Sequence, residues 1–443
     1  MAPRTYTMEE VARHDGRDGT YWTVVDGEVY DLGEFMPKHP GRGLLKLAAG
    51  RQATPLFESY HPGPSLERAR RVLGRRTRHV GSLDPAEVLS RGNPTFFDDV
   101  QQRVAERLRE RGLDYRSGGW IMATEAVIVA SIYAVAWYFR AFDGSYLAAI
   151  VGGVMMARMG FLMHSGNHAA VARRSIRNRL CGLLMEYIGG SSIIWRHAHQ
   201  FAHHGHPNIY GYDNDCEIGT PLLRFHPEIP HRPWHRIQHI GLAIGMSVGM
   251  VKWLVSDVTH LLRGRVVNAS FHLERRTLTL AMLHKVAWGS VHLVLPMVVL
   301  GPLHGVLTTL VMLAIGSYYM EGIFIVNHLQ KDLVPPNDRH WAEQQVMGTT
   351  NWGSASRWSN FISGGLNHQI EHHLFPSMAV HLYPVIAPVV REACEDHGIP
   401  YRSFRGFWPA LWGTIGFLHA LGWPKAAGVD RTVPREGSSL SAE

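Results

Sequence analysis

Apolar residues in this chain are concentrated in a few long runs. Two of these, 119–141 and 145–163, are joined by Asp143-Gly144, and a further run from about 284 to 326 is broken at Gly301-Pro302. An α-helix needs about 20 predominantly apolar residues to cross a bilayer. The pattern therefore predicts a mostly α-helical membrane domain with four spans, arranged as two hairpins.

Two other apolar segments do not fit a simple span. Residues 181–195 are too few to cross a bilayer, and 237–262 contains Lys252 and Asp257. Histidine clusters lie on both sides of 237–262 in the sequence, and they can meet only if an even number of crossings separates them. We therefore predict that 237–262 lies along the membrane interface.

The N-terminal part has a different pattern, with short segments separated by turn residues. Residues 21–25 and 29–32 are rich in β-branched and aromatic side chains and flank Asp26-Gly27, which indicates a β-hairpin. After a basic connector, residues 96–113 predict an amphipathic helix with Arg, Glu and Gln on its polar face. A small α+β domain is therefore expected ahead of the spans.

These patterns divide the chain into four parts. Residues 5–83 form the small N-terminal domain, 84–117 a linker with the amphipathic helix, 118–405 the membrane domain and 406–443 a C-terminal tail. The last residues of the tail, about 15 of them, predict disorder. Three tryptophans of the tail predict a belt at the membrane interface: Trp408, Trp412 and Trp423.

Composition narrows the class of protein. The 443 residues carry a formal net charge of +7 and include 28 histidines but only three cysteines, Cys181, Cys216 and Cys394. Three scattered cysteines without a CxxC pair support neither a disulfide framework nor a thiolate metal site. Since no helix-turn-helix, zinc-finger or RNA-binding motif accompanies the positive charge, we attribute it to anionic lipid headgroups and expect no nucleic-acid partner.

Arginines also predict the orientation in the membrane. Eight of them flank the spans on the side of the histidine clusters: Arg173, Arg174, Arg177, Arg179, Arg263, Arg265, Arg275 and Arg276. Positively charged loops stay in the cytoplasm. The histidine clusters and the N-terminal domain are therefore expected on the cytoplasmic side.

Histidines gather in three clusters, which carry the chemistry of the chain. Neutral imidazole is the commonest protein ligand for a transition metal, and these clusters offer more ligands than one tetrahedral ion needs. We therefore predict a two-metal site. Its candidate metal-binding and catalytic residues are His164, His168, His199, His203, His204, Gln369, His372 and His373.

The spacing inside the clusters fits this prediction. Residues four apart share one face of a helix, as His164 and His168 do, and as His199 and His203 do. His204 points about 100° further round the helix than its neighbour. Adjacent imidazoles are therefore expected to face two different ions.

The N-terminal domain resembles the cytochrome b5 family. The matching residues include Val29-Tyr30-Asp31-Leu32, His39-Pro40-Gly41 and, 22 residues after His39, His61-Pro62. The resemblance implies that His39 and His61 are the axial ligands of a haem b. Arg42 departs from the family, which has glycine there; if that position needs a positive φ, arginine costs on the order of 1 kcal/mol.

The membrane domain resembles the integral-membrane fatty acid desaturase superfamily in the order of its histidine clusters and spans. The third cluster, in Gly364-Gly365-Leu366-Asn367-His368-Gln369-Ile370-Glu371-His372-His373-Leu374-Phe375-Pro376, is similar to the signature of front-end desaturases, which also carry a fused cytochrome b5 domain. The resemblance covers roughly residues 5–402. It implies a diiron centre and a four-span helical fold with the histidines in a cap on the cytoplasmic side.

The resemblance also bears on residues near the clusters. In this superfamily one histidine outside the clusters supplies a further ligand, which points to His328, with His340 as the competing candidate. Ser165 stands where family members usually have aspartate. The acidic segment Asp213-Asn214-Asp215-Cys216-Glu217 is expected to support the ligand histidines.

The implied reaction is O2-dependent insertion of a cis double bond into a fatty acyl chain, between the carboxyl group and an existing double bond. An unactivated C–H bond offers no acidic proton, so it needs a metal-derived oxidant. Two electrons per turnover would come through the haem from a separate NAD(P)H-dependent reductase, because no GxGxxG or flavin-binding segment is present in this sequence.

Two alternatives stay open at this stage. The same metal site serves sphingoid-base desaturases and acyl hydroxylases, and the clusters do not distinguish these outcomes. A haem protein that only relays electrons, with an inactive metal domain, is an alternative of another class. The sequence also leaves open the double-bond position, the chain length and the carrier of the acyl group.

Overall fold

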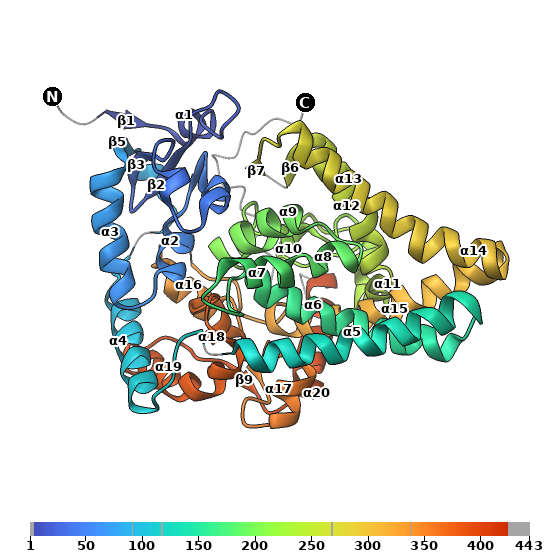
Figure 1. Ribbon diagram of the computed structural model, residues 1–443. Helices are drawn as coiled ribbons and strands as arrows, with labels where there is room; N and C mark the ends of the chain where they lie inside the picture. The colour runs from blue at the N-terminus through green and yellow to red at the C-terminus, as the bar shows by residue number, and fades with distance from the viewer. Residues whose placement is uncertain (1–3, 91, 117, 267–268, 337, 424–443) are drawn as a thin grey trace.

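A computed structural model describes residues 4–90, 92–116, 118–266, 269–336 and 338–423. The predicted disorder at the C-terminus lies outside these residues. The described chain forms a small N-terminal domain that packs against a helical cap, from which four long helices extend to one side (Figure 1). The predicted fold class, a mostly helical four-span domain preceded by an α+β domain, is confirmed.

The N-terminal domain is built on a five-stranded sheet with the strand order β1-β5-β3-β2-β4. The predicted hairpin is confirmed: β2 pairs antiparallel with β3, from Trp22 opposite Asp31 to Val25 opposite Glu28. Asp26 and Gly27 between the strands have φ values of 53° and 78°, as the tight two-residue hairpin turn requires. The elements of the domain are β1 (Thr5–Tyr6), α1 (Met8–Ala12), β2 (Trp22–Val25), β3 (Glu28–Asp31), η1 (Met36–Lys38), η2 (Arg42–Ala48), β4 (Arg51–Gln52), α2 (Thr54–Tyr60), α3 (Pro64–Arg76) and β5 (Arg78–Leu83).

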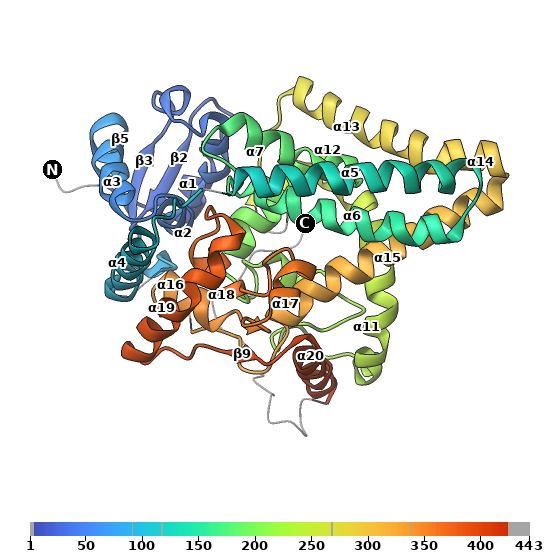
Figure 2. The same ribbon diagram turned by 60° about the horizontal axis from the view of Figure 1, so that its bottom comes forward.

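The linker helix α4 (Thr95–Glu110) follows the short turn η3 (Pro85–Glu87). Its apolar residues recur at helical spacing, and Phe97, Val100 and Val104 are buried against the cap. Phe97 makes an edge contact with Trp341, at 4.6 Å between ring centroids. The amphipathic pattern thus places α4 as a brace along the cap, where it runs beside α19 (Tyr383–Asp396) in Figure 2.

Four helices are long and apolar enough to cross a membrane, as predicted. They are α5 (Gly119–Phe142), α6 (Tyr146–Asn167), the continuous run of α13 (Arg275–Gly289), η6 (Ser290–Val294) and α14 (Leu295–Leu300), and α15 (Pro302–His328). Of the most apolar 18 residues of each helix, 67% are buried within the protein in α6 and 50% in α15. The corresponding shares are 22% in α5 and 17% in the third span. The inner pair therefore holds the bundle together, and the outer pair faces lipid.

Residues 237–262, expected along the interface, form α11 (Gln238–Ser247) and α12 (Gly249–Arg263), with a bend of 72° between the two helices. Asp257 of α12 is buried and forms a 3.0 Å ion pair with Lys285 of α13. Of the two charges that argued against a membrane span here, that of Asp257 is thus neutralised by an ion pair with the third span. The interfacial position itself remains a prediction.

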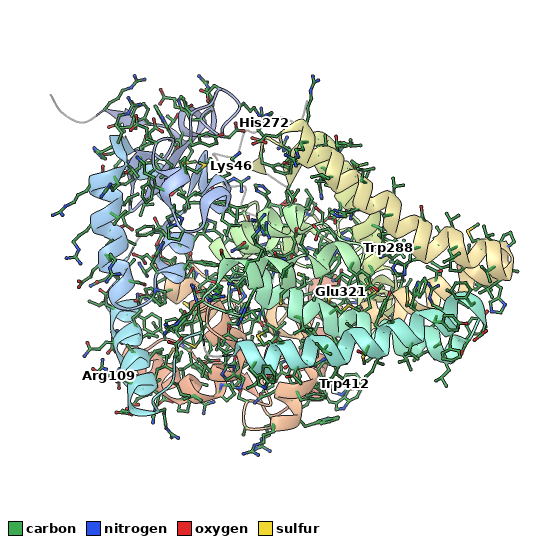
Figure 3. All side chains as sticks on the ribbon, in the orientation of Figure 1. Lys46, Arg109, His272, Trp288, Glu321 and Trp412 are labelled. Atoms are coloured by element: carbon green, nitrogen blue, oxygen red, sulfur yellow. The ribbon has the colours of Figure 1, made fainter. Side chains whose placement is uncertain are left out.

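The cap consists of short helices and turns at the cluster-bearing ends of the spans. Its remaining elements are α7 (Ser175–Gly182), α8 (Leu184–Tyr187), α9 (Ser192–Trp195), η4 (Arg196–His203), α10 (Asn214–Glu217), η5 (Pro233–Ile237), β6 (Arg265–Val266), β7 (Ala269–Ser270), α16 (Trp341–Met347), β8 (Asn351–Trp352), α17 (Arg357–Ile362), α18 (Gln369–Leu374), η7 (Val380–Leu382), β9 (Ser403–Phe404) and α20 (Phe407–Gly422). Trp412 of α20 lies on the outside of the molecule (Figure 3), as an interfacial tryptophan would.

Close contact between α6 and α15 depends on Gly153. A Cβ atom at this position would lie 2.5 Å from the carbonyl oxygen of Met312 in α15, whereas a Cβ at the adjacent Gly152 would lie 3.5 Å from the Met312 sulfur. The first contact involves backbone that cannot move aside, and the second is an ordinary van der Waals distance.

We therefore expect Gly153→Ala to destabilise the bundle by roughly 1–3 kcal/mol, since overpacking a tight core costs about that much. The melting temperature of the detergent-solubilised protein measures the effect. Gly152→Ala, one residue away on the same helix, is the matched control and should melt close to the parent protein. Equal melting temperatures for the two variants would contradict the close-packing account.

Candidate metal centre

The three histidine clusters converge in the cap at the ends of α6 and α15. Two groups of histidines have ligand nitrogens within 4.8 Å of one another. The first group contains His164, His168, His199, His204 and His372, and the second contains His203, His328 and His373. Histidines separated by more than 200 positions in the sequence thus form two adjacent groups, as a two-metal site requires.

Each cluster is held by a different element. His164 lies in the last turn of α6 with His168 just beyond it, and α15 ends at His328. The second cluster is carried by η4, and the third by the short helix α18. The two inner spans therefore contribute histidines to both groups, and the cap supplies the remaining histidines.

The second cluster has a local structure that the sequence did not predict. On an α-helix His199 and His203 would share one face, but residues 196–203 form a π-helix, whose turn is wider. The two rings stack at 5.1 Å between centroids. His199 lies in the first group and His203 in the second, and the two also lie within 4.8 Å of each other and of Asp215, so His199 and His203 stand where the two groups meet. The expectation that adjacent His203 and His204 face different groups agrees with the structure.

The histidine nitrogens are arranged to bind metal. A ligand histidine usually donates its Nδ1 proton to a partner, which leaves Nε2 free and fixes the ring. Four histidines have such a contact at Nδ1, with the following partners: Tyr60 Oη for His168 (2.6 Å), Asp213 Oδ1 for His203 (3.1 Å), Tyr383 Oη for His372 (3.2 Å) and Gln345 Oε1 for His373 (2.7 Å).

The opposite nitrogens are left without partners. Among the described residues, nothing hydrogen-bonds to the buried Nε2 atoms of His168, His372 and His373. In the first group, Nε2 of His164 faces Nε2 of His199 at 3.0 Å. Buried polar atoms without partners cost free energy, so a cation bound between these rings would satisfy them.

Electrostatics supports the same assignment. Burial, together with repulsion between neighbouring rings, lowers the pKa well below its usual value for His168, His199, His204, His372 and His373. These imidazoles are therefore neutral at physiological pH, and only the neutral ring can ligate a metal.

His203 is different from the other ligand candidates. Burial lowers its pKa, but the carboxylates of Asp213 and Asp215 outweigh this and raise the pKa to about 9. Asp213 is buried and contacts Nδ1 through both carboxylate oxygens, whereas Asp215 lies 3.5 Å away. The acidic segment identified in the sequence thus makes His203 the most basic imidazole of the second group. Its ring must release a proton when it binds a cation, and it is then a strong electron donor.

Gln369 takes a position that differs from the predicted ligand role. Its side-chain nitrogen lies 3.1 Å from Nε2 of His328, and its oxygen accepts a hydrogen bond from Asn327. The Asn327 amide nitrogen also donates to the carbonyls of Ile323 and Leu366, which fixes its orientation. The Gln369 oxygen, the atom that would bind a metal, therefore faces away from the imidazoles.

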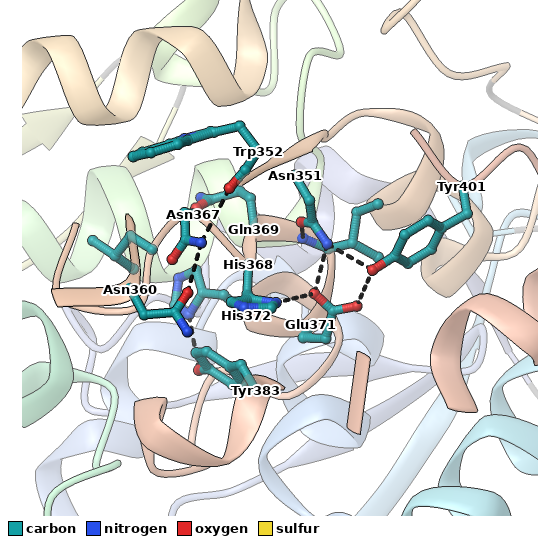
Figure 4. Close-up of polar contacts among 12 residues, drawn as sticks. Asn351, Trp352, Asn360, Asn367, His368, Gln369, Glu371, His372, Tyr383 and Tyr401 are labelled. Carbon is teal, nitrogen blue, oxygen red and sulfur yellow. Dashed lines mark hydrogen bonds and ion pairs between the residues drawn. The ribbon is translucent and has the colours of Figure 1, made fainter. Parts of the chain in front are cut away.

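The third cluster is held in place by residues with no motif of their own (Figure 4). Glu371 is buried and accepts hydrogen bonds from Asn351 Nδ2 at 2.8 Å and from Tyr401 Oη at 2.7 Å. Asn351 Oδ1 also accepts from the amide of Ile370. These contacts fix a helix of only six residues. Sequence inspection could not assign them, because a single Asn or Tyr distant from a cluster carries no spacing pattern.

The structure also shows the surroundings of three other residues that the sequence singled out. His340, the competitor of His328, lies outside both groups and 3.8 Å from Glu58. Ser165 donates to the carbonyl of Phe161 in its own helix, so the missing aspartate is replaced by a local bond. Arg42 begins the 3₁₀-helix η2 and so has right-handed backbone, which removes the expected cost of a positive φ.

The second candidate site is a cavity of about 1750 Å³ between the N-terminal domain and the cap. His39 and His61 line it and face each other at 6.1 Å between ring centroids. Metal–imidazole bonds are about 2 Å long, so this spacing leaves room for one iron atom. Lys46 and His272, one from each domain, also line the cavity (Figure 3).

The two rings differ in their Nδ1 contacts. His61 donates to the carbonyl of Phe57 at 2.7 Å, which leaves its Nε2 free, whereas His39 accepts from the amide of Gly41 at 2.9 Å. A metal at Nε2 of His39 would have to displace that bond. Burial, with repulsion from His61, lowers the pKa of His39 to about 4, and burial lowers that of His61, so both rings are neutral. Neutral imidazoles beside apolar walls fit a haem.

Comparison with known proteins agrees with this geometry. Residues 144–405 match the family described as Fatty acid desaturase, and residues 7–84 match the Cytochrome b5-like Heme/Steroid binding domain. The chain belongs to the fatty acid desaturase family. The desaturase is therefore an oxidoreductase; its N-terminal domain implies a haem, and its histidine clusters are consistent with a diiron centre.

Relatives match this desaturase along most of its length. It is 31% identical to a chloroplastic acyl-lipid (7-3)-desaturase of Chlamydomonas reinhardtii, over 94% of this chain and 82% of the relative. An acyl-lipid (8-3)-desaturase of Physcomitrium patens is 28% identical over 95% and 92% of the two chains. A Delta(5) fatty acid desaturase of Dictyostelium discoideum is 26% identical over 95% and 94%. The predicted resemblance to front-end desaturases is confirmed.

We expect Asp213→Asn to weaken iron binding by about 10- to 100-fold, because it removes the charge that supports His203. Iron retained after dialysis against a chelator, measured by mass spectrometry, tests this. Asp215→Asn is the matched control; its side chain is 44% exposed and lies farther from the ring, so its loss should be smaller. Full iron retention in Asp213→Asn would show that the contact is dispensable.

Proposed function

We propose that this desaturase inserts a cis double bond between the carboxyl group of an acyl chain and a double bond that the chain already has. The observation that carries the proposal is the convergence of eight histidines into two groups at the ends of the inner spans. An acyl chain can reach such a site from the bilayer between apolar helices. The printed names of the relatives, acyl-lipid and Delta(5) desaturases, support an acyl substrate held on a lipid.

The proposed ligand set follows the two groups. His164, His168, His199, His204 and His372 would hold one iron, and His203, His328 and His373 the other. The iron pair supplies O2 activation strong enough to break unactivated C–H bonds. Gln369 would orient His328 by donating to it, while Asp213, Gln345 and Tyr383 keep the ligand rings from turning.

Haem bound by His39 and His61 would relay electrons, and we propose a separate NAD(P)H-dependent reductase as their source. The cavity that contains both histidines is lined by the cap as well as by the N-terminal domain. Docking of the domain on the cap keeps the donor close to the acceptor, as in other linked modules. We also propose that both domains lie on the cytoplasmic side, supported by the arginines around the clusters, and that the chain divides at the boundaries given above.

The product of the reaction tests the proposed function. A host that expresses the chain and is fed saturated, monounsaturated and polyunsaturated acyl chains should form a new double bond on the carboxyl side of an existing one. Gas chromatography–mass spectrometry of derivatised fatty acids locates that bond. His372→Ala should abolish the product, because it removes a ligand of the first group, and should leave the haem spectrum unchanged.

A matched control separates loss of the ligand from loss of any histidine. His397→Ala changes a histidine that contacts Asp99 outside both groups, and product yield should remain. Normal product yield in His372→Ala would refute the diiron assignment. A hydroxylated acyl chain in the lipid extract would show that the protein is an acyl hydroxylase of the same superfamily. A desaturated sphingoid base would show that it is a sphingoid-base desaturase.

The haem assignment has a separate test. His61→Ala should lose the haem absorbance and reductase-driven desaturation but retain its non-haem iron, because His61 lies outside both histidine groups. Absorption spectra and iron content of the purified protein measure the two effects. A normal haem spectrum in this variant would refute His61 as an axial ligand.

A further inference from the structure

Tyr60 makes a contact between the two redox domains that no motif predicts. It is the last residue of α2 and immediately precedes His61. Its hydroxyl lies 2.6 Å from Nδ1 of His168, which is 108 positions away in the sequence and belongs to the first histidine group. The chain neighbour of a haem-ligand candidate thus touches an iron-ligand candidate directly.

The contact is held from a second direction. Gln200 Nε2 donates to the Tyr60 hydroxyl oxygen at 2.7 Å, and Gln200 lies on η4, between His199 and His203. The Tyr60 and His168 rings are nearly parallel, with 25° between their planes. Because a neutral His168 that offers Nε2 to a metal carries its proton on Nδ1, it donates to the Tyr60 oxygen. Tyr60 therefore accepts bonds from the membrane-domain cluster and from the π-helix together.

Other contacts dock the two domains without reaching the histidine groups. Trp341 Nε1 donates to the carboxylate of Glu58 at 2.5 Å. Arg51 donates to the carbonyl of Ser270 at 3.0 Å, and Lys46 pairs with Glu274 at 3.1 Å. Docking therefore does not depend on the Tyr60 hydroxyl, which leaves this group free for a role at the metal site.

We propose that Tyr60 is the positioning residue that connects the haem domain to the iron site. It orients His168 and provides the path for electrons from His61 to His168, through the two side chains, the peptide bond that joins Tyr60 to His61 and one hydrogen bond. This inference rests on the proposed function, since it takes the two histidines to be metal ligands. The phenol remains protonated and is neither oxidised nor reduced.

Each desaturation requires two electrons to pass from the haem to the iron site. Conversion of –CH2–CH2– and O2 into –CH=CH– and two water molecules takes up two electrons and two protons. Each electron comes from a ferrous haem that becomes ferric, so two electrons pass in succession for each double bond. The haem is reduced again by the NAD(P)H-dependent reductase between the two transfers.

The test compares two variants that each remove one hydroxyl from a ligand histidine. Tyr60→Phe removes the contact with His168, and Tyr383→Phe removes the 3.2 Å contact with His372, which comes from the membrane domain itself. Full-length protein loaded with haem and iron is reduced with dithionite and mixed with oxygenated detergent buffer containing phosphatidylcholine with polyunsaturated chains. Stopped-flow absorbance of the haem records its reoxidation, and iron-depleted protein gives the direct reaction with O2.

We expect Tyr60→Phe to slow the iron-dependent reoxidation by about 10- to 100-fold, the usual effect of losing a partner of a metal ligand. Its haem spectrum, haem content and iron content should match those of the parent protein. Tyr383→Phe also loses a partner of a ligand histidine but leaves the path from His61 intact, so it should slow reoxidation clearly less than Tyr60→Phe does. Reoxidation rates are expressed per haem bound, so partial loading does not obscure the comparison.

Two results would overturn the inference. Parent-like reoxidation in Tyr60→Phe would show that electrons do not depend on this contact. Equal slowing in both variants would show that each hydroxyl acts only by shaping the iron site. If the parent protein itself shows no iron-dependent reoxidation, the failure lies in the proposed function and not in Tyr60.

Discussion

Burial of many imidazoles in one place is the constraint on which this structure depends. A buried imidazole is tolerated when it is neutral and its polar nitrogens have partners, and eight histidines share the two groups here. Each Nδ1 partner comes from a different part of the chain: Tyr60 from the N-terminal domain, Asp213 after the second cluster, Gln345 from α16 and Tyr383 from α19. Hydrogen bonds to the histidines therefore connect segments that are far apart in the chain.

The need to bury and pair the histidines also explains why the inner spans, the outer spans and the cap have different roles. The inner spans α6 and α15 approach closely at Gly153 and carry His164 and His328 in their last turns, so their packing sets the positions of these two ligand candidates. The outer spans contribute lipid-facing surface and no ligand. The cap supplies polar partners that a membrane span could not carry without cost. Function is thus concentrated where the apolar bundle meets the polar cap.

The N-terminal domain is a structural part of the site as well as an attached electron carrier. It closes a cavity with the cap around His39 and His61, and Glu58 of α2 is bonded to Trp341 of α16. Two residues after Glu58, Tyr60 reaches His168. One short helix therefore docks the domain, carries a haem-ligand candidate at its end and contacts the metal centre.

The sequence by itself determined the local features of this protein. Runs of apolar residues gave the four spans, because the length that crosses a bilayer is a local property, and Asp26-Gly27 gave the hairpin, because its turn depends on two residues. Histidine spacing within the clusters identified the candidate ligands. Only the tertiary structure decided the rest: the π-helix that carries the second cluster, the hydrogen bonds that hold the Gln369 amide between Asn327 and His328, and the contacts of Tyr60, Asn351 and Tyr401. These depend on hydrogen bonds between residues far apart in the chain, and no periodicity in a sequence records which distant side chain will satisfy a buried polar atom.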